Sequence, residues 1–309
     1  MLRLLVIGSA AGGGFPQWNS NDEGSRRARA GDPKALPRSQ SSIAVSADDR
    51  RWVLVNASPD LRQQINANPR LHPKEGKRHS PLVGVVLTNG DVDHVAGLLT
   101  LRESYPLSLY ATGRVLSILA ENSIFNVLNP EFVERRTMPL DTEFEVSTRD
   151  GDGTGVFVEA FAVPGKVALY REDAAAGPNF GTLPEDTVGL KIRSADGPAL
   201  FYIPGCARMS DDLRHRLHGA PLVLFDGTLW RDDEMIVAGV GTKTGRRMGH
   251  ISVSGPDGSI AAFQSLDVAR KIFVHINNTN PILLADSAER AEAEAAGWEV
   301  AYDGMEVTL

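Results

Sequence analysis

The stretch LTNGDVDHVAGLL, residues 87–99, brings two carboxylates and an imidazole together directly after an apolar run. That run, residues 82–87, is typical of a buried strand, and the residues after the cluster have a helical pattern. Asp91, Asp93 and His94 therefore crowd the end of a strand. Like charges repel and burying a charge is costly, so the cluster is either a solvated turn or the binding place of a cation.

A helix cap explains only part of this cluster. Carboxylates are favoured in the first turn of a helix by its dipole, which accounts for Asp93 and partly for Asp91. It does not account for His94 beside them. Carboxylate oxygens and an imidazole nitrogen form a ligand set suited to Fe(II), Mn(II) or Zn(II). A polar turn and a metal site both remain open on these residues alone.

Two more polar side chains follow apolar runs. His275 lies in VHINNTNP, residues 274–281, where strand alternation turns its imidazole to the face opposite its apolar neighbours. Asp226 ends the run in LVLFDGT, residues 222–228. Sites in α/β proteins gather at the carboxyl ends of strands. A hydrogen-bonded structural histidine and an Asp-Gly turn are the alternatives.

A glycine-rich basic loop, TKTGRRMGHIS, contains His250. Its three cations, Lys243, Arg246 and Arg247, either hold an anionic group or form a solvated face.

The segment GSAAGGGFPQWN, residues 8–19, follows the first predicted strand. It does not fit a dinucleotide-binding turn, because Phe15-Pro16 breaks the helix which that turn requires. We therefore expect no nucleotide cofactor. A glycine-rich hairpin that borders a pocket, with Phe15 and Trp18 as apolar walls, fits better.

Composition excludes several classes of protein. The 309 residues carry a formal charge of -7, which argues against general affinity for nucleic acid or anionic membranes. The single cysteine, Cys206, excludes an internal disulfide and fits a reducing compartment, so we expect a cytoplasmic protein. No run of ~20 apolar residues is present, and we expect no membrane span.

Short apolar runs alternate with helical patterns along the whole chain, which favours one α/β domain over residues 1–309 with two sheets and outer helices. Residues 19–40 and 171–187 are loop-like. The predicted strands are 4–7, 43–45, 52–55, 83–87, 107–110, 156–163, 188–192, 200–203, 222–225 and 272–276, and the predicted helices follow Ser58-Pro59 and span 95–103, 115–122, 211–217 and 287–296.

The segment TNGDVDH, residues 88–94, resembles the T-H-x-H-x-D-H motif of the metallo-β-lactamase superfamily, with Asn89 and Asp91 in place of two histidines. The whole chain resembles one branch of that superfamily, the coenzyme PQQ synthesis protein B family. The resemblance lies in GSAAGGGFPQWN, PRSQSSIAVS, NASPDLRQQI, TNGDVDHVAGLLTLRE, YIPGCAR, LFDGT, GVGTKTGRRMGHIS and FVHINNTNP.

This resemblance implies an αββα sandwich, two mixed β-sheets flanked by helices, with a metal site at the sheet edge. It also implies a role in the biosynthesis of pyrroloquinoline quinone (PQQ), a redox cofactor. One expected activity is Fe(II)- and O2-dependent hydroxylation of a tyrosine-derived PQQ precursor. The alternative is a non-catalytic carrier that helps PQQ or its precursor reach the periplasm. Expected partners are the precursor peptide or an intermediate, other PQQ biosynthesis proteins and a second copy of the chain.

The sequence departs from the wider patterns in two respects. The superfamily's middle histidine, expected near residues 163–165, and its bridging aspartate, expected near residues 205–206, are missing. Two-zinc hydrolysis depends on such ligands, so a residual metal-dependent hydrolase is only a second alternative. Many family members also carry W-N-C-x-C-x-x-C, where this chain has Ser20, Asp22 and Ser25. We therefore predict that the N-terminal structural zinc is absent.

The resemblance and the residues together give a predicted mononuclear site. Asp93, His94 and His275 are the expected metal ligands, a set like the two-histidine, one-carboxylate arrangement of non-haem Fe(II) oxygenases. Fe(II) is the expected metal, with Zn and Mn as alternatives. The expected catalytic residues are Asp91, a fourth ligand or a partner that orients a histidine, and Asp226 and His250, each a ligand, base or substrate contact. The expected substrate-binding residues are Phe15, Trp18, Asn278 and Asn280 as pocket wall and Lys243, Arg246 and Arg247 as carboxylate partners.

Overall fold

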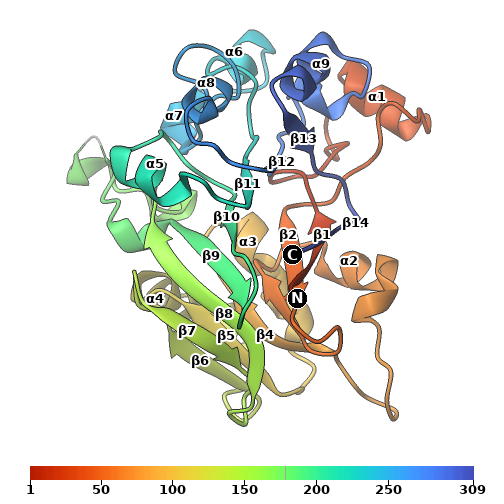
Figure 1. The fold of residues 1–309 in the computed structure, drawn as a ribbon, viewed down its shortest axis with the longest axis vertical. Coiled ribbons are helices and arrows are strands. Elements are labelled where there is room, and N and C mark those ends of the chain that lie inside the picture. Colours follow the sequence, from red (N-terminus) through yellow and green to blue (C-terminus); the bar gives the residue numbers. More distant parts are fainter. Residues whose placement is uncertain (178) are drawn as a thin grey trace.

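Two mixed seven-stranded sheets form the centre of the computed structural model, which describes residues 1–177 and 179–309 (Figure 1). The first sheet has the order β14 (Met305–Thr308), β1 (Arg3–Gly8), β2 (Ser42–Ser46), β3 (Trp52–Val55), β4 (Leu82–Val86), β5 (Leu107–Ala111) and β6 (Val133–Thr137). The second has the order β13 (Trp298–Val300), β12 (Lys271–Val274), β11 (Leu222–Asp226), β10 (Leu200–Ile203), β9 (Val188–Ser194), β8 (Gly153–Ala162) and β7 (Glu143–Ser147).

Short helices connect these strands. The α-helices are α1 (Glu23–Arg29), α2 (Leu61–Ala67), α3 (Val92–Val95), α4 (Gly113–Glu121), α5 (Asp211–Leu217), α6 (Glu234–Val237), α7 (Gly245–Met248), α8 (Ser259–Phe263) and α9 (Ala288–Ala295). The 3₁₀ segments are Pro69–Leu71, Ala96–Leu101, Ser123–Val127, Leu169–Arg171, Ala174–Ala176, Pro184–Asp186 and Pro281–Leu283. In the described part of the chain, none of the helices has the length and apolar character needed to cross a bilayer.

Apolar side chains on both faces of each sheet create the layers. Along β1, Leu4 and Val6 pack into the core between the sheets, whereas Leu5 and Ile7 pack on the outer face with residues of α2 and α4. The outer face of the second sheet packs in the same way against α5, α8 and α9. Strands buried on both faces have continuous apolar runs, which is why the sequence shows short apolar runs rather than alternation. The predicted αββα fold class is confirmed.

Parallel strands bring the polar clusters to one end of the sandwich. Strands β3 to β6 are parallel in the first sheet, and β10 to β13 are parallel in the second. Residues that follow β4, β11 and β12 therefore lie at carboxyl ends of strands, where α/β proteins place their sites. The two sheets meet there, because the Val188 amide donates to the Thr88 carbonyl across 2.9 Å.

The helix expected over residues 95–103 is wrong in position and in type. The structure has α3 followed by a 3₁₀ segment, so Asp93 and His94 lie inside a helical turn rather than before it. The cause is a close approach to residues 57–58. The Gly97 amide donates to the Ala57 carbonyl across 2.9 Å, and a Cβ on Gly97 would lie 2.1 Å from another carbonyl oxygen there. This tertiary bond diverts an amide from the α-helical ladder.

Two other predicted boundaries are corrected. The strand expected over residues 272–276 ends at Val274, because His275 has a left-handed φ of 56°. The loop expected over residues 19–40 contains helix α1, which the Asp22 side chain caps by accepting from the Ser25 amide across 2.7 Å.

Candidate metal centre

Asp93, His94 and His275, which we call the metal trio, converge although they follow strands of different sheets. Asp93 and His94 belong to α3, which follows β4, and His275 follows β12. The His275 Nε2 atom lies 3.0 Å from Asp93 Oδ2, and His94 Nε2 lies 3.9 Å from the same oxygen. One ligand atom from each residue lies within 4.8 Å of the others. The trio therefore has the spacing to hold one cation.

His94 is oriented by Asn89, which sequence reasoning left without a role. The Asn89 Oδ1 atom lies 2.7 Å from His94 Nδ1, so Nδ1–H donates to the amide oxygen. The other nitrogen, Nε2, is buried and has no hydrogen-bond partner in the described residues. Leaving a buried polar atom unsatisfied is costly, and a metal ion on Nε2 removes that cost. Asn89 occupies the first histidine position of the superfamily motif. That position is the sequence feature from which a role for Asn89 at the site could have been predicted.

Electrostatics in the metal trio suit a cation. Burial lowers the pKa of His94 to about 4, which keeps its imidazole neutral, as a metal ligand must be. Although burial opposes the charged form, His94 and the hydrogen bond with His275 hold the pKa of Asp93 well below its usual range. The same bond with Asp93 raises the pKa of His275 against the effect of burial. His94 is thus held in ligand form, and a cation would replace the proton that His275 shares with Asp93.

Thr228 connects the metal trio to a second group, Asp226 and His250. The Thr228 Oγ1 atom lies 2.8 Å from His275 Nδ1 and 3.0 Å from His250 Nδ1. With Nδ1–H donated to this hydroxyl, His275 presents Nε2 to Asp93 and to a cation. The left-handed backbone of His275 is rare for a residue with a side chain, and such conformations cluster at functional sites.

Asp226, His250 and His275 form a second group with metal-ligand spacing, but the Asp226 carboxylate is already saturated. Its Oδ2 accepts from the Cys206 amide across 2.9 Å and lies 2.8 Å from His250 Nδ1. Its Oδ1 accepts from the Thr228 amide at 3.0 Å and the Thr228 hydroxyl at 2.6 Å. This set of partners favours an Asp226–His250 pair that orients an imidazole, and the metal trio as the cation site.

A cleft of about 350 Å³ opens onto the metal trio. Asp91 and His250 line it, together with Ala11, Gly12, Lys166, Lys243, Met235, Met248 and Asn277. Asp91 belongs to neither ligand group. Its Oδ1 accepts from the Leu169 amide across 3.3 Å, and burial raises its pKa while the charge of Lys166 opposes that rise. Asp91 therefore lies beside the metal trio as a cleft residue.

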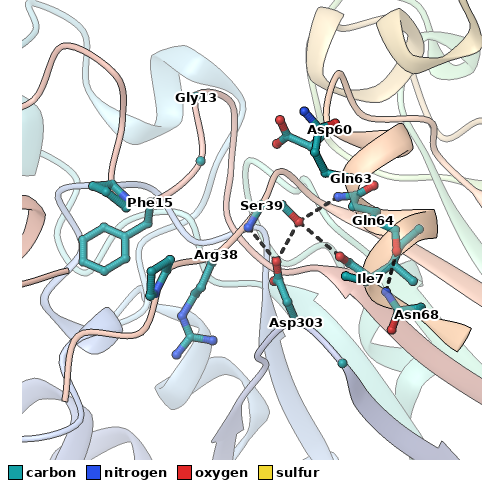
Figure 2. A pocket seen from close by; sticks show the side chains of 15 residues that line it. Ile7, Gly13, Phe15, Arg38, Ser39, Asp60, Gln63, Gln64, Asn68 and Asp303 are labelled. Atoms are coloured by element: carbon teal, nitrogen blue, oxygen red, sulfur yellow. Dashed lines mark hydrogen bonds between the residues drawn. The ribbon is translucent and has the colours of Figure 1, made fainter. Parts of the chain in front are cut away.

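The aromatic wall expected for this cleft lies elsewhere. Gly13 and Gly14 have positive φ values of 93° and 69°, and they turn the chain away after Gly12. Phe15 is consequently buried beside a separate hollow that Ser39 and Asp303 also line (Figure 2).

Trp18 is 85% exposed, and it does not line the cleft. Asn278 and Asn280 line a different hollow, and the Asn280 side chain donates to the Gly227 carbonyl across 2.8 Å. Backbone positions 11 and 12 and Asn277 provide the wall instead.

The three cations of the basic loop also lie in different places. Lys243 lines the cleft, whereas Arg246 and Arg247 line an adjoining hollow. Arg247 pairs with Glu172 through two hydrogen bonds of 2.7 and 3.0 Å and lies over the Phe180 ring. Lys166, which sequence reasoning missed, lines both spaces. It directly follows the Val163-Pro164-Gly165 segment where the superfamily histidine was expected.

Comparison with known proteins places the chain in a family. Residues 51–276 match the model of the "Beta-lactamase superfamily domain". Coenzyme PQQ synthesis protein B from Rhodopseudomonas palustris (strain BisB5) is 57% identical over 311 residues, and that from Gluconacetobacter diazotrophicus is 56% identical over 310 residues. Each alignment covers 100% of both chains. This chain belongs to the coenzyme PQQ synthesis protein B family.

A solved structure of the coenzyme PQQ synthesis protein B family agrees with this assignment. The crystal structure of Zn(2+)-bound PqqB from Methylobacterium extorquens superposes with a TM-score of 0.94 and 54% identity, over 99% of this chain and 100% of that one. A diphosphatase of the PhnP family gives a TM-score of 0.69 at 18% identity, over 100% and 98% of the two chains. At that identity the likeness shows the shared fold alone. The donor atoms of the metal trio, with the orphaned His94 Nε2, fit a bound metal.

In this member of the coenzyme PQQ synthesis protein B family, hydrogen bonds connect the three positions at which a structural zinc was predicted to be absent. The Asp22 carboxylate accepts from the Ser25 amide at 2.7 Å and from Asn278 Nδ2 at 2.9 Å. Asn278 Nδ2 also donates to Ser20 Oγ across 3.2 Å. The segment that carries α1 is therefore fastened to the loop after His275.

Proposed function

We propose that this chain acts in PQQ biosynthesis by hydroxylating the aromatic ring of a tyrosine-derived precursor, with Fe(II), O2 and an external two-electron reductant. One oxygen atom of O2 enters the ring, and the reductant's two electrons with two protons take the other to water. The observation that carries the proposal is the metal trio, in which the buried Nε2 of His94 lacks a partner and a cleft lies alongside. The full-length identity to coenzyme PQQ synthesis proteins supports the pathway. We place the reaction in the cytoplasm, where the precursor and the other proteins of PQQ biosynthesis are its partners.

Asp93, His94 and His275 would hold the metal. Two histidines and one carboxylate are the ligand set typical of non-haem Fe(II) oxygenases, in which coordination positions stay open. Bound Fe(II) would supply the activation of O2, which is chemistry of the metal. The chain supplies the position of the ring and a walled space that Met235 and Met248 help to enclose.

His250 is the proposed proton acceptor for the phenol of the precursor. Its Nδ1–H donates to Asp226 Oδ2 at 2.8 Å, which leaves the lone pair on Nε2. Removing the phenol proton makes the ring richer in electrons and easier to oxidise. Asp226 holds the tautomer and the orientation of the imidazole, as the carboxylate of a catalytic triad does. Asp91, on the same cleft, is a second group that can take up a proton.

Among the substrate contacts expected from the sequence, Lys243 is the one that lines the cleft. The other substrate contacts expected from the sequence lie in hollows beside the cleft or at the surface: Phe15, Trp18, Asn278, Asn280, Arg246 and Arg247. They can serve only a substrate that reaches beyond the cleft. A peptide that presents its tyrosine to the metal trio has that reach.

The test is reconstitution of the metal-free chain without oxygen, using Fe(II), Mn(II) or Zn(II) in separate samples. Each sample then receives O2, a tyrosine-bearing peptide and a two-electron reductant such as ascorbate, and mass spectrometry weighs the product. The proposal predicts O2 consumption and a peptide heavier by one oxygen atom with Fe(II) only. Tight PQQ binding without turnover at any metal would instead indicate a carrier, and zinc-dependent ester cleavage would indicate a hydrolase.

A further inference from the structure

Three cations converge on one carboxylate beside the cleft. Arg247 binds Glu172 at 2.7 and 3.0 Å, while the Nζ atoms of Lys166 and Lys243 each lie 3.8 Å from a Glu172 oxygen. The Glu172 side chain is only 12% exposed. One carboxylate, that of Glu172, thus faces three positive charges where the cleft meets the adjoining hollow.

The two kinds of cation are held differently. Arg247 makes a two-pronged pair with Glu172 and lies 3.7 Å over the Phe180 ring, so its guanidinium group is held in place. A distance of 3.8 Å is too long for a hydrogen bond. Neither lysine ammonium group donates a hydrogen bond to any residue of 1–177 or 179–309. Lys166 and Lys243 therefore present free donors to the cleft.

The position of Lys166 is built into the fold. Its carbonyl accepts from the Thr187 hydroxyl across 2.8 Å, which fixes the backbone after β8. Its aliphatic stem passes Gly249, where an added Cβ would lie only 3.0 Å from Lys166 Cγ. The Lys166 side chain lines the cleft together with Asp91 and the metal trio. Lys166 is therefore a fixed cation between the metal trio and the adjoining hollow that Arg246 and Arg247 line.

We propose that Lys166 and Lys243 bind a carboxylate of the substrate while its ring lies at the metal trio. Glu172, anchored by Arg247, is the resident carboxylate that the substrate's carboxylate replaces at the two lysines. This inference rests on the proposed function and deepens it, because it assigns an acidic substrate and names its partners. Lys243 should contribute less to the binding energy than Lys166, because its side chain is 37% exposed compared with 19% and its charge is more strongly screened by solvent and salt.

A structural role for the lysines makes a different prediction. If Lys166 and Lys243 only balanced the charge of Glu172 and Asp91, their loss would change stability without changing the choice between ligands. A role in binding instead requires that an acid and its ester be distinguished, because only the acid gains charge-assisted hydrogen bonds.

The test compares binding of PQQ, which carries several carboxylates, with binding of its fully methylated ester to the purified full chain. Both titrations use Zn(II)-loaded and metal-free protein and need no turnover, so a failure of the oxygenase activity is seen separately. Wild-type protein is expected to prefer the acid. Lys166→Met should weaken acid binding by about tenfold and leave ester binding unchanged, with a smaller loss for Lys243→Met. The exposed Lys77→Met is the control for net charge.

Glu172→Gln provides the opposite test, since removing the resident carboxylate should strengthen binding of the acid. Three results would each overturn the proposal. The wild type could show no preference for the acid, Lys166→Met could lose acid and ester binding equally, or Glu172→Gln could bind the acid more weakly. Thermal unfolding of every variant shows that the compared chains are folded.

Discussion

The Nε2 atom of His275 lies 3.0 Å from Oδ2 of Asp93, although 182 positions separate the two residues in the sequence. Asp93 follows a strand of one sheet and His275 follows a strand of the other, so this contact exists only because the two sheets end together. Fixing two imidazoles and a carboxylate at such a junction brings ligands together before any metal arrives.

Replacing His94 by Ala should abolish turnover and release the metal. The substitution removes a ligand, so the loss of metal affinity should exceed the roughly 10–100-fold that loss of an outer partner costs. Metal analysis after dialysis and the activity assay measure the two effects. Exposed His215 on α5, changed to Ala, is the matched control. Normal turnover by the His94 variant would show that the ligand assignment is wrong.

Thr228→Val should weaken metal binding by roughly 10–100-fold, because it removes the hydroxyl that orients His275. Thr228→Ser keeps the hydroxyl and should restore most of the affinity. Competition with a metal chelator compares the three proteins. Equal affinities in the Val and Ser variants would mean that this hydroxyl does not position the ligand.

His250→Gln should keep its metal and lose roughly 10²–10⁴-fold in kcat, which is the usual contribution of a general base. The proposal places His250 on the cleft as a proton acceptor and not in the metal trio. Metal content and kcat measured on the same preparation separate these roles. Loss of metal in proportion to activity would indicate that His250 is a ligand.

Glu234→Gln should stabilise the chain above neutral pH and have little effect near pH 5. Burial raises the pKa of Glu234 from 4.5 to about 7. Between pH 4.5 and about 7 the folded state thus binds more protons than the unfolded state. The free energy of unfolding therefore falls by about 3 kcal/mol as the pH rises through this range. Denaturant unfolding of both proteins at pH 5 and pH 8 measures the difference. A constant difference between the proteins at the two pH values would refute the assignment.

The sequence was enough to predict site residues that directly follow an apolar strand. Asp93, His94 and His275 each follow a strand that is apolar because both its faces are buried, so the chain pattern itself marked them. Strands β6 and β7 escaped prediction because they read VERRT and EFEVS, with charged residues where an interior strand would be apolar. They lie at the edges of the two sheets, where one side of a strand is unpaired.

Contacts between distant segments were beyond sequence reasoning. Lys166 belongs to no motif, and it acquires its place from Thr187 and Gly249, which are remote in the chain. Phe15 was expected to face the pocket, but the left-handed turn at Gly13 and Gly14 carries it into the core. In both cases backbone geometry set by tertiary contacts decided where the side chain lies.

The most direct test of the central claim is a crystal structure of the Fe(II)-loaded chain, with anomalous diffraction measured at the iron edge. The account predicts one strong peak about 2.0–2.2 Å from a carboxylate oxygen of Asp93 and from one nitrogen each of His94 and His275. A peak on Asp226 and His250 alone, or no peak within reach of His94, would contradict it.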